Sequence, residues 1–165
     1  MAVHLEIDLP DPAATDRAGA ALGLALRPGD AVLLEGRLGA GKSAFARAAI
    51  TALLAEDGRA EEVPSPTYTL AQVYETGRGT VWHADLYRLG SPEEAVELGL
   101  SEAFGAAICF VEWSSRLGAE RPRGALEARL DFGYETDARR LTLSATDARW
   151  HEAAEAAKAA AERPA

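Results

Sequence analysis

The sequence predicts an α/β fold built around a phosphate-binding loop, because three neighbouring segments occur in the order that such a loop requires. Residues 36–43 read Gly-Arg-Leu-Gly-Ala-Gly-Lys-Ser and fit the pattern G-x-x-x-x-G-K-[ST]. A short apolar run at 31–34 precedes this loop and suits a buried strand. An Ala-rich segment at 44–54 follows it, with its large apolar residues spaced like a helix face. Strand, glycine loop and helix together are the context in which this pattern binds phosphate.

The residues before the loop predict one strand and one helix. Residues 3–9 alternate apolar and polar side chains, which is typical of a half-buried strand. Residues 11–15 have the composition of a turn and helix start, and the helix itself is expected over 18–26. A turn at 27–30 then leads into the strand before the loop.

The segment after the loop helix predicts an extended stretch and a hairpin. Two prolines flank Ser65, and they keep the chain at 63–70 extended. Residues 70–74 and 80–84 predict two strands, which a hairpin turn at 75–79 connects.

A helix start and a second buried strand come next. Ser91 suits the N-cap position, with Pro92 at the first helical position and Glu94 at the third. A second short helix is expected from Ser101, and the apolar run 106–111 predicts another buried strand.

The remaining sequence predicts two strands and a C-terminal helix. The strands are expected at 125–132 and 140–145, with a turn near 133–138. We expect residues 1–146 to form a single domain, and residues 147–165 to form an Ala-rich, helical and partly exposed tail.

Composition narrows the functional class. The chain has 165 residues, 48% of them hydrophobic, and a formal net charge of −9. An acidic domain is a poor candidate for binding a nucleic-acid backbone by itself. No apolar stretch approaches the ~18 residues of a membrane span, and no signal peptide is visible. The single Cys109 cannot form an internal disulfide, which favours a free thiol in the reducing cytoplasm.

The glycine loop predicts a triphosphate and a metal ion. Its backbone N–H groups form a concave anion site, and the following helix adds its positive N-terminal end. Lys42 is expected to reach the β- and γ-phosphates, and the Ser43 hydroxyl is expected to bind Mg²⁺. A dinucleotide-binding fingerprint starting at Gly39 is excluded, because it needs a glycine where the chain has Ala44.

Two acids at strand ends are candidates for holding the metal. Glu112 ends the apolar run 106–111, and Asp85 ends the strand expected at 80–84. We expect Glu112 to serve Mg²⁺, and Asp85 to position the attacking water or to bind Mg²⁺ through water. His83 is either a general base or a core histidine, and the sequence favours the core histidine.

Two further features bear on hydrolysis. The stretch Ser65-Pro66-Thr67 is either a switch loop that senses the γ-phosphate or a rigid proline turn. Arg88 either neutralises triphosphate charge or pairs with a nearby glutamate. No residue is an obvious arginine finger, so we expect hydrolysis by the isolated chain to be slow and a partner to complete the site.

Five motifs in order resemble one family. They are Gly36–Ser43, Ser65–Leu70, His83–Leu89, Glu93–Leu100 and Val111–Trp113. Together they look like the TsaE family, formerly YjeE, the P-loop ATPases of tRNA threonylcarbamoyladenosine biosynthesis. The resemblance spans roughly residues 5–145.

The resemblance implies a P-loop NTPase-like three-layer α/β fold, whose mixed parallel and antiparallel central sheet is flanked by helices. It implies ATP and Mg²⁺ binding with weak intrinsic hydrolysis. It also implies assembly with TsaB and TsaD, which transfer threonylcarbamoyl to adenosine 37 of tRNA, so that this chain meets tRNA only through the complex.

Residue by residue, the resemblance implies three groups of site residues. The metal positions are Ser43 and Glu112, and the catalytic positions are Asp85, Lys42 and Thr67. The nucleotide-binding positions are Asp11, Thr15, Gly36, Leu38, Gly39, Ala40, Gly41, Lys42, Ser43 and Arg139.

Two alternatives remain open from the residues alone. A small-molecule or nucleotide kinase would use the same loop, although such kinases need a lid and an acceptor pocket, and no clear lid is visible in the sequence. A nucleotide-gated binding module, in which hydrolysis is incidental, differs from the ATPase interpretation only by degree.

Overall fold

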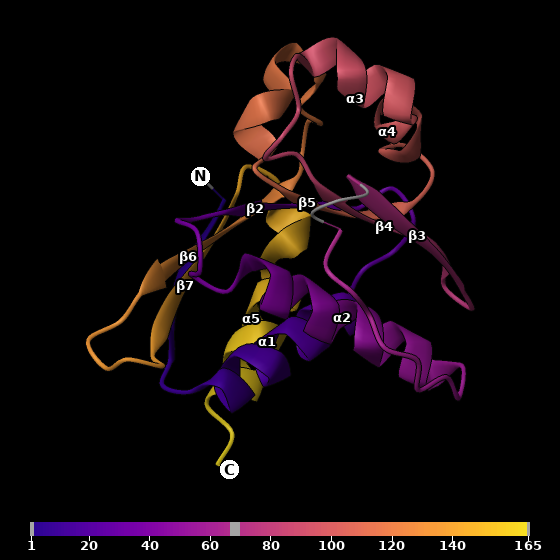
Figure 1. Ribbon diagram of the computed structural model, residues 1–165. Coiled ribbons are helices and arrows are strands. Elements are labelled where there is room, and N and C mark those ends of the chain that lie inside the picture. Colours follow the sequence, from indigo (N-terminus) through magenta and orange to yellow (C-terminus); the bar gives the residue numbers. More distant parts are fainter. Residues whose placement is uncertain (1, 67–69, 165) are drawn as a thin grey trace.

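A mixed sheet forms the middle layer of the molecule, and helices cover both of its faces (Figure 1). The computed structural model describes residues 2–66 and 70–164. Within that part of the chain the sheet has seven strands, in the order β1-β7-β6-β2-β5-β4-β3. The strands are β1 (Val3–Leu9), β2 (Ala31–Glu35), β3 (Ala71–Thr76), β4 (Gly79–Asp85), β5 (Ile108–Glu112), β6 (Leu126–Phe132) and β7 (Arg139–Ala145).

The centre of the sheet is parallel and its edges are antiparallel. Strand β2 pairs in parallel with β5 and β6, and β5 pairs in parallel with β4. At the edges, β3 runs antiparallel to β4, β7 to β6, and β1 to β7. This arrangement confirms the expected mixed sheet. It also places the carboxyl ends of β2, β4, β5 and β6 together at one end of the strands. Open α/β sheets bind ligands at this carboxyl-terminal end.

The helices divide between the two faces of the sheet (Figure 1). One face carries α1 (Pro12–Leu24), α2 (Lys42–Glu56) and α5 (His151–Ala161), and α1 packs against both of the others. The other face carries α3 (Pro92–Leu98), α4 (Leu100–Ala103) and the 3₁₀ helix η1 (Ser114–Glu120). A one-turn 3₁₀ helix, η2 (Ala148–Trp150), precedes α5.

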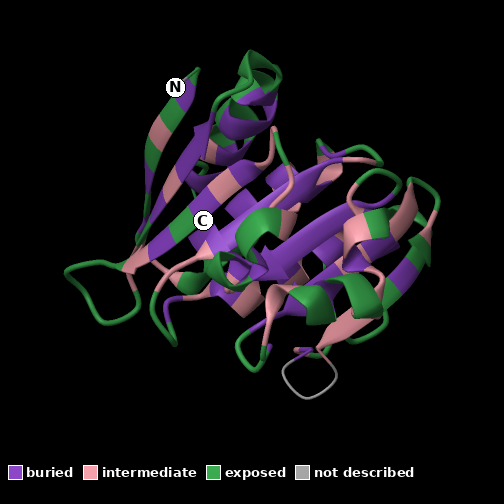
Figure 2. Ribbon diagram, turned by 90° about the horizontal axis from the view of Figure 1, so that it is seen from above, coloured by how far each residue is buried: buried purple, intermediate pink, exposed green. Residues whose placement is uncertain are grey.

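Two hydrophobic clusters stabilise this arrangement, one on each face of the sheet. Successive side chains of a strand point to opposite faces, so Ile108 and Phe110 of β5 pack in the cluster with α1 and α2. The intervening Cys109 and Val111 pack in the cluster with α3 and α4. The central strands are therefore buried on both faces, as Figure 2 shows.

The first helix begins within residues 11–15, where a turn and helix start was predicted. The bounds predicted for the helix itself, 18–26, are wrong, because α1 extends from Pro12 to Leu24. The Asp11 carboxylate accepts a hydrogen bond from the Ala14 N–H at 2.8 Å, and the proline occupies a first-turn position that needs no N–H donor. The side-chain cap thus places the helix start at the beginning of residues 11–15.

The predicted cap of the third helix differs in its hydrogen bonds. Ser91 is the N-cap residue of α3, but its hydroxyl does not cap the helix, and the Glu94 carboxylate accepts instead from the Gly90 N–H at 3.3 Å. The short helix expected from Ser101 begins one residue earlier, at Leu100.

The Ala-rich C-terminal segment forms α5 and lies against α1. Its inward-facing alanines are buried, and the Arg17 guanidinium donates to the carbonyl oxygens of Ala160 and Ala161 at 3.0 and 3.2 Å. Small side chains allow the two helices to approach closely. Among the described residues, no helix has the length and apolar character to cross a membrane.

Candidate functional site

The loop at 36–43 connects β2 to α2 at the carboxyl-terminal end of the parallel strands. Gly36 has a φ of +141°, and a Cβ there would run into the carbonyl oxygen of Leu130 on β6. Gly41 is the N-cap residue of α2 with a φ of +107°. Because glycine has no capping side chain, the first N–H groups of α2 are left for a ligand. Since α2 has 15 residues, its positive end favours an anion at this point.

Lys42 lies inside this loop. Its Nζ donates to the carbonyl oxygens of Gly36 at 2.6 Å and Arg37 at 3.1 Å. The ammonium also lies 4.4 Å from the centre of the Trp113 ring, which is a cation–π distance. Burial lowers the pKa of Lys42, and the neighbouring carboxylates, chiefly Glu112, oppose that shift. The charge is thus held in a partly desolvated position where it attracts anions strongly.

Ser43 and Glu112 meet across the loop. The Ser43 Oγ lies 2.9 Å from Oε1 and 2.8 Å from Oε2 of Glu112, to which its hydroxyl donates. Glu112 is buried, with 3% of its surface exposed, and His83 Nε2 lies 2.7 Å from its Oε2. The structure therefore joins the two predicted metal positions directly.

Asp85 lies beside Glu112. The two residues are partners in the parallel pairing of β4 with β5, and both are buried. The Asp85 Oδ1 accepts a hydrogen bond from the Tyr87 N–H at 3.1 Å, which holds the chain where it leaves β4. Two carboxylates thus lie side by side at the carboxyl ends of β4 and β5, next to Lys42 and Ser43.

A hollow of about 340 Å³ contains these groups. Its lining includes the P-loop, both acids, and the arginine and aromatic residues around them: Leu38, Gly39, Gly41, Lys42, Ser43, Ala44, Arg47, Asp85, Tyr87, Arg88, Glu112 and Trp113. Arg88 thus reaches the hollow, as its predicted phosphate role requires. Thr67 lies outside the described residues, so its role stays a prediction.

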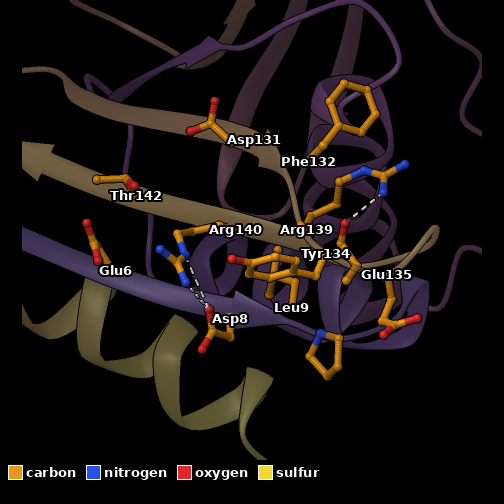
Figure 3. Close-up of a pocket in the computed structure, with 13 residues that line it drawn as sticks. Glu6, Asp8, Leu9, Asp131, Phe132, Tyr134, Glu135, Arg139, Arg140 and Thr142 are labelled. Atoms are coloured by element: carbon orange, nitrogen blue, oxygen red, sulfur yellow. Dashed lines mark hydrogen bonds and ion pairs between the residues drawn. The ribbon is translucent and has the colours of Figure 1, made fainter.

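A larger hollow of about 720 Å³ is lined by residues of β1, β6 and β7 and of the turn between β6 and β7 (Figure 3). Arg139 donates to the Gly39 carbonyl oxygen at 3.5 Å, and its guanidinium lies 4.8 Å from the centre of the Phe132 ring. Leu9 and Tyr134 line the same hollow, and Tyr134 is fully exposed. Its lining combines apolar and aromatic surface with two arginines and with the carboxylates of Glu6, Asp8, Asp131 and Glu135. Apolar surface with a few polar groups is typical of small-molecule sites.

The structure separates Asp11 and Thr15 from these two hollows. The Asp11 side chain caps α1, and Thr15 is buried at the start of that helix. Neither residue lines either hollow, whereas their neighbours Leu9 and Pro10 line the larger one. The nucleotide contacts predicted for Asp11 and Thr15 stay predictions.

The sequence did not predict three features of this site. They are the contact of His83 with Glu112, the contact of Trp113 with Lys42, and the place of Phe132 in the lining of the larger hollow. One signal was available for His83: it precedes Asp85 by two residues and so shares its face of the strand. For Phe132 no local signal exists, because its place depends on β6 lying next to β2.

Comparison with known sequences identifies the same family that the five sequence motifs resemble. The family described as "Threonylcarbamoyl adenosine biosynthesis protein TsaE" matches residues 9–141. A relative from Rickettsia bellii, named tRNA threonylcarbamoyladenosine biosynthesis protein TsaE, is 42% identical over 105 residues, covering 64% of this chain and 71% of that protein. A relative of the same name from Bacillus subtilis is 34% identical over 125 residues, 75% of each chain. A third, from Rickettsia felis, is 46% identical over 93 residues, and the match spans about half of that protein (53%).

A solved structure supports the same comparison at the level of the fold. The crystal structure of Bacillus subtilis YdiB superposes with a TM-score of 0.76 and 28% sequence identity. The superposition covers 94% of each chain, so the similarity extends over the sheet and both helical layers.

Proposed function

The chain belongs to the TsaE family of threonylcarbamoyl adenosine biosynthesis proteins, and we propose from this that it is an ATP-binding, weakly ATP-hydrolysing subunit for tRNA N6-threonylcarbamoyladenosine modification. One observation carries the proposal. The P-loop lysine, the P-loop serine and two strand-end carboxylates line a single hollow at the edge of the parallel strands. Phosphoryl transfer needs these groups, because its catalysis consists mainly of positioning and charge stabilisation.

The proposed triphosphate site uses the P-loop. The backbone N–H groups from Gly39 to Ser43 and the N-terminus of α2 would bind the phosphates. Lys42 would exchange its carbonyl partners, Gly36 and Arg37, for phosphate oxygens. The nucleoside would extend toward the larger hollow, where Arg139 contacts Gly39.

The oxygen donors of the site fit Mg²⁺. Ser43 Oγ and the Glu112 carboxylate lie within 3 Å of one another, and hard oxygen ligands of this kind suit Mg²⁺. No group of three or more His, Cys, Asp or Glu side chains with metal-binding geometry occurs in the described part of the chain. A site with few protein ligands is what Mg²⁺ uses when phosphates supply the others. When bound, the ion would neutralise charge on the β- and γ-phosphates.

Asp85 is proposed to position the attacking water. It lies next to Glu112 and lines the hollow that holds Lys42. Arg88 lines the same hollow and would lie near the triphosphate. We propose that the isolated chain hydrolyses ATP slowly because a partner must supply the missing stabilisation of the transition state.

TsaB and TsaD are the proposed partners, and tRNA contact is proposed to occur only through them. The net charge of −9 supports this division, since an acidic chain gains little from a phosphate backbone. The buried thiol of Cys109, which cannot pair within the chain, agrees with a proposed site of action in the cytoplasm.

The decisive experiment measures ATP hydrolysis by the chain alone and with purified TsaD and TsaB. We expect the partners to stimulate hydrolysis, and Asp85→Ala to reduce the stimulated rate by about 10²-fold or more. Asp16→Ala removes an exposed carboxylate on α1 and is the matched control. Partner-independent transfer of phosphate to a small acceptor would refute the proposal and favour a kinase.

A further inference from the structure

His83 is a fully buried histidine whose imidazole reaches the carboxylate of Glu112. Its exposed fraction is 0%, and its Nε2 lies 2.7 Å from Glu112 Oε2. It lies on β4 two residues before Asp85, so the two side chains share a face of the sheet. Glu112 is the β5 partner of Asp85, which makes His83 its diagonal neighbour on that face.

Packing alone does not account for a histidine at this position. Its Nδ1 makes no hydrogen bond in the part of the chain that the structure describes. Burying a polar atom without a partner has an energetic cost that a leucine or methionine side chain would not incur. Among the described residues, the one polar contact of the ring is with Glu112, so that contact is what distinguishes histidine from an apolar residue here.

The contact fixes the orientation of the Glu112 carboxylate. A glutamate side chain has three rotatable bonds, and Ser43 by itself bonds both carboxylate oxygens without selecting either. The Oε2 atom also contacts His83 Nε2, at 2.7 Å, so the imidazole distinguishes between the two oxygens, which Ser43 does not. A donor behind a metal-binding carboxylate orients it in this way in many metal sites.

We propose that His83 is a positioning residue, which holds the Glu112 carboxylate in the orientation that binds the nucleotide-associated Mg²⁺. This inference rests on the proposed ATP and Mg²⁺ site. It requires no change in the protonation of the ring, only that Nε2 carries a hydrogen and donates it to the carboxylate.

Two substitutions of matched length separate positioning from packing. His83→Gln keeps an amide N–H donor at the distance of Nε2 from the backbone, whereas His83→Met has the same number of side-chain bonds and no donor. Binding of AMP-PNP is measured by calorimetry over a series of MgCl₂ concentrations, and binding of ADP is measured in EDTA. Circular dichroism melting curves report the stability of each variant.

We expect His83→Met to raise the Mg²⁺ concentration for half-maximal AMP-PNP binding by about 10- to 100-fold. His83→Gln should remain close to the wild type, and ADP binding in EDTA should be unchanged in both variants. In a Glu112→Gln background, His83→Met should add no further effect, because it acts through the carboxylate. If His83→Met does not fold, His83→Asn replaces it, since its shorter amide cannot reach Glu112.

The outcomes that overturn the inference are distinct from failure of the proposed function. A lower melting temperature with unchanged Mg²⁺ dependence in His83→Met would show a packing role only. An additive effect in the Glu112→Gln background would show that His83 does not act through that carboxylate. If the wild type itself binds AMP-PNP without any Mg²⁺ dependence, the proposed function fails rather than the role of His83 alone.

Discussion

Glu112→Gln is the substitution that tests the candidate site most directly. The carboxylate accepts from Ser43 Oγ at 2.9 and 2.8 Å and contacts His83 Nε2 at 2.7 Å, while 3% of the residue is exposed. Hydrogen bonds to a charged group are worth about 1.5–3 kcal/mol each, and neutral ones about 0.5–1.5 kcal/mol. The neutral amide therefore loses about 1–1.5 kcal/mol in each of the two contacts, and relief of the buried charge offsets part of this loss.

The effect on ligand binding should have opposite signs with and without metal. With Mg²⁺ present, we expect AMP-PNP affinity to fall by about 10- to 100-fold, which corresponds to about 1.4–2.8 kcal/mol. In EDTA we expect ADP to bind more tightly than to the wild type, because one negative charge near the phosphates has been removed. Isothermal titration calorimetry under both conditions measures this reversal.

Glu97→Gln provides the control, since it removes the same charge from an exposed position on α3. It should leave both affinities at wild-type values. Unchanged Mg²⁺ dependence in Glu112→Gln would refute the metal assignment and transfer that role to Asp85. Equal weakening with and without Mg²⁺ would show that the substitution damages the loop rather than a metal site.

Three further predictions concern the framework of the site. Gly36→Ala should lower the free energy of unfolding by about 1–3 kcal/mol, because it combines a positive φ with a Cβ that meets Leu130; an unchanged urea midpoint would contradict this reasoning. Burial raises the pKa of the Cys109 thiol from 9.0 to about 12, so a thiol reagent at pH 8 should label the chain only after unfolding. Because the unfolded thiol ionises first, stability should also decline as the pH rises from 9 toward 12, and less so in Cys109→Ala.

The local elements of the fold were predictable from the sequence with few errors. The apolar runs before the P-loop and before Glu112 predicted β2 and β5, because strands buried on both faces need continuous apolar sequence. The first turn of α1 was predicted only as a helix start at 11–15 and not as part of the helix, because a single hydrogen bond, which the Asp11 carboxylate accepts from the Ala14 N–H, decides it. Such a bond depends on one side chain, whereas the apolar runs that predicted the strands extend over several residues.

The candidate site was predictable in its residue types but not in its connections. Lys42, Ser43, Asp85 and Glu112 were chosen for their chemistry and their places at element ends, and the structure brings all four into one hollow. The link from His83 to Glu112 depends on the lateral pairing of β4 with β5, which no local pattern encodes. Arg139 reaches Gly39 only because the hairpin of β6 and β7 lies next to β2.

The sequence by itself determined that this protein has a phosphate-binding loop, since eight consecutive residues carry the donors and the glycines that such a loop needs. It also determined the acids at the strand ends, and through five ordered motifs it pointed to the TsaE family. Only the tertiary structure decided which groups touch: Ser43 with Glu112, Glu112 with His83, and Lys42 with Trp113. The physical reason is that the loop chemistry is local in the chain, whereas these contacts join residues up to 71 positions apart and depend on the strand order.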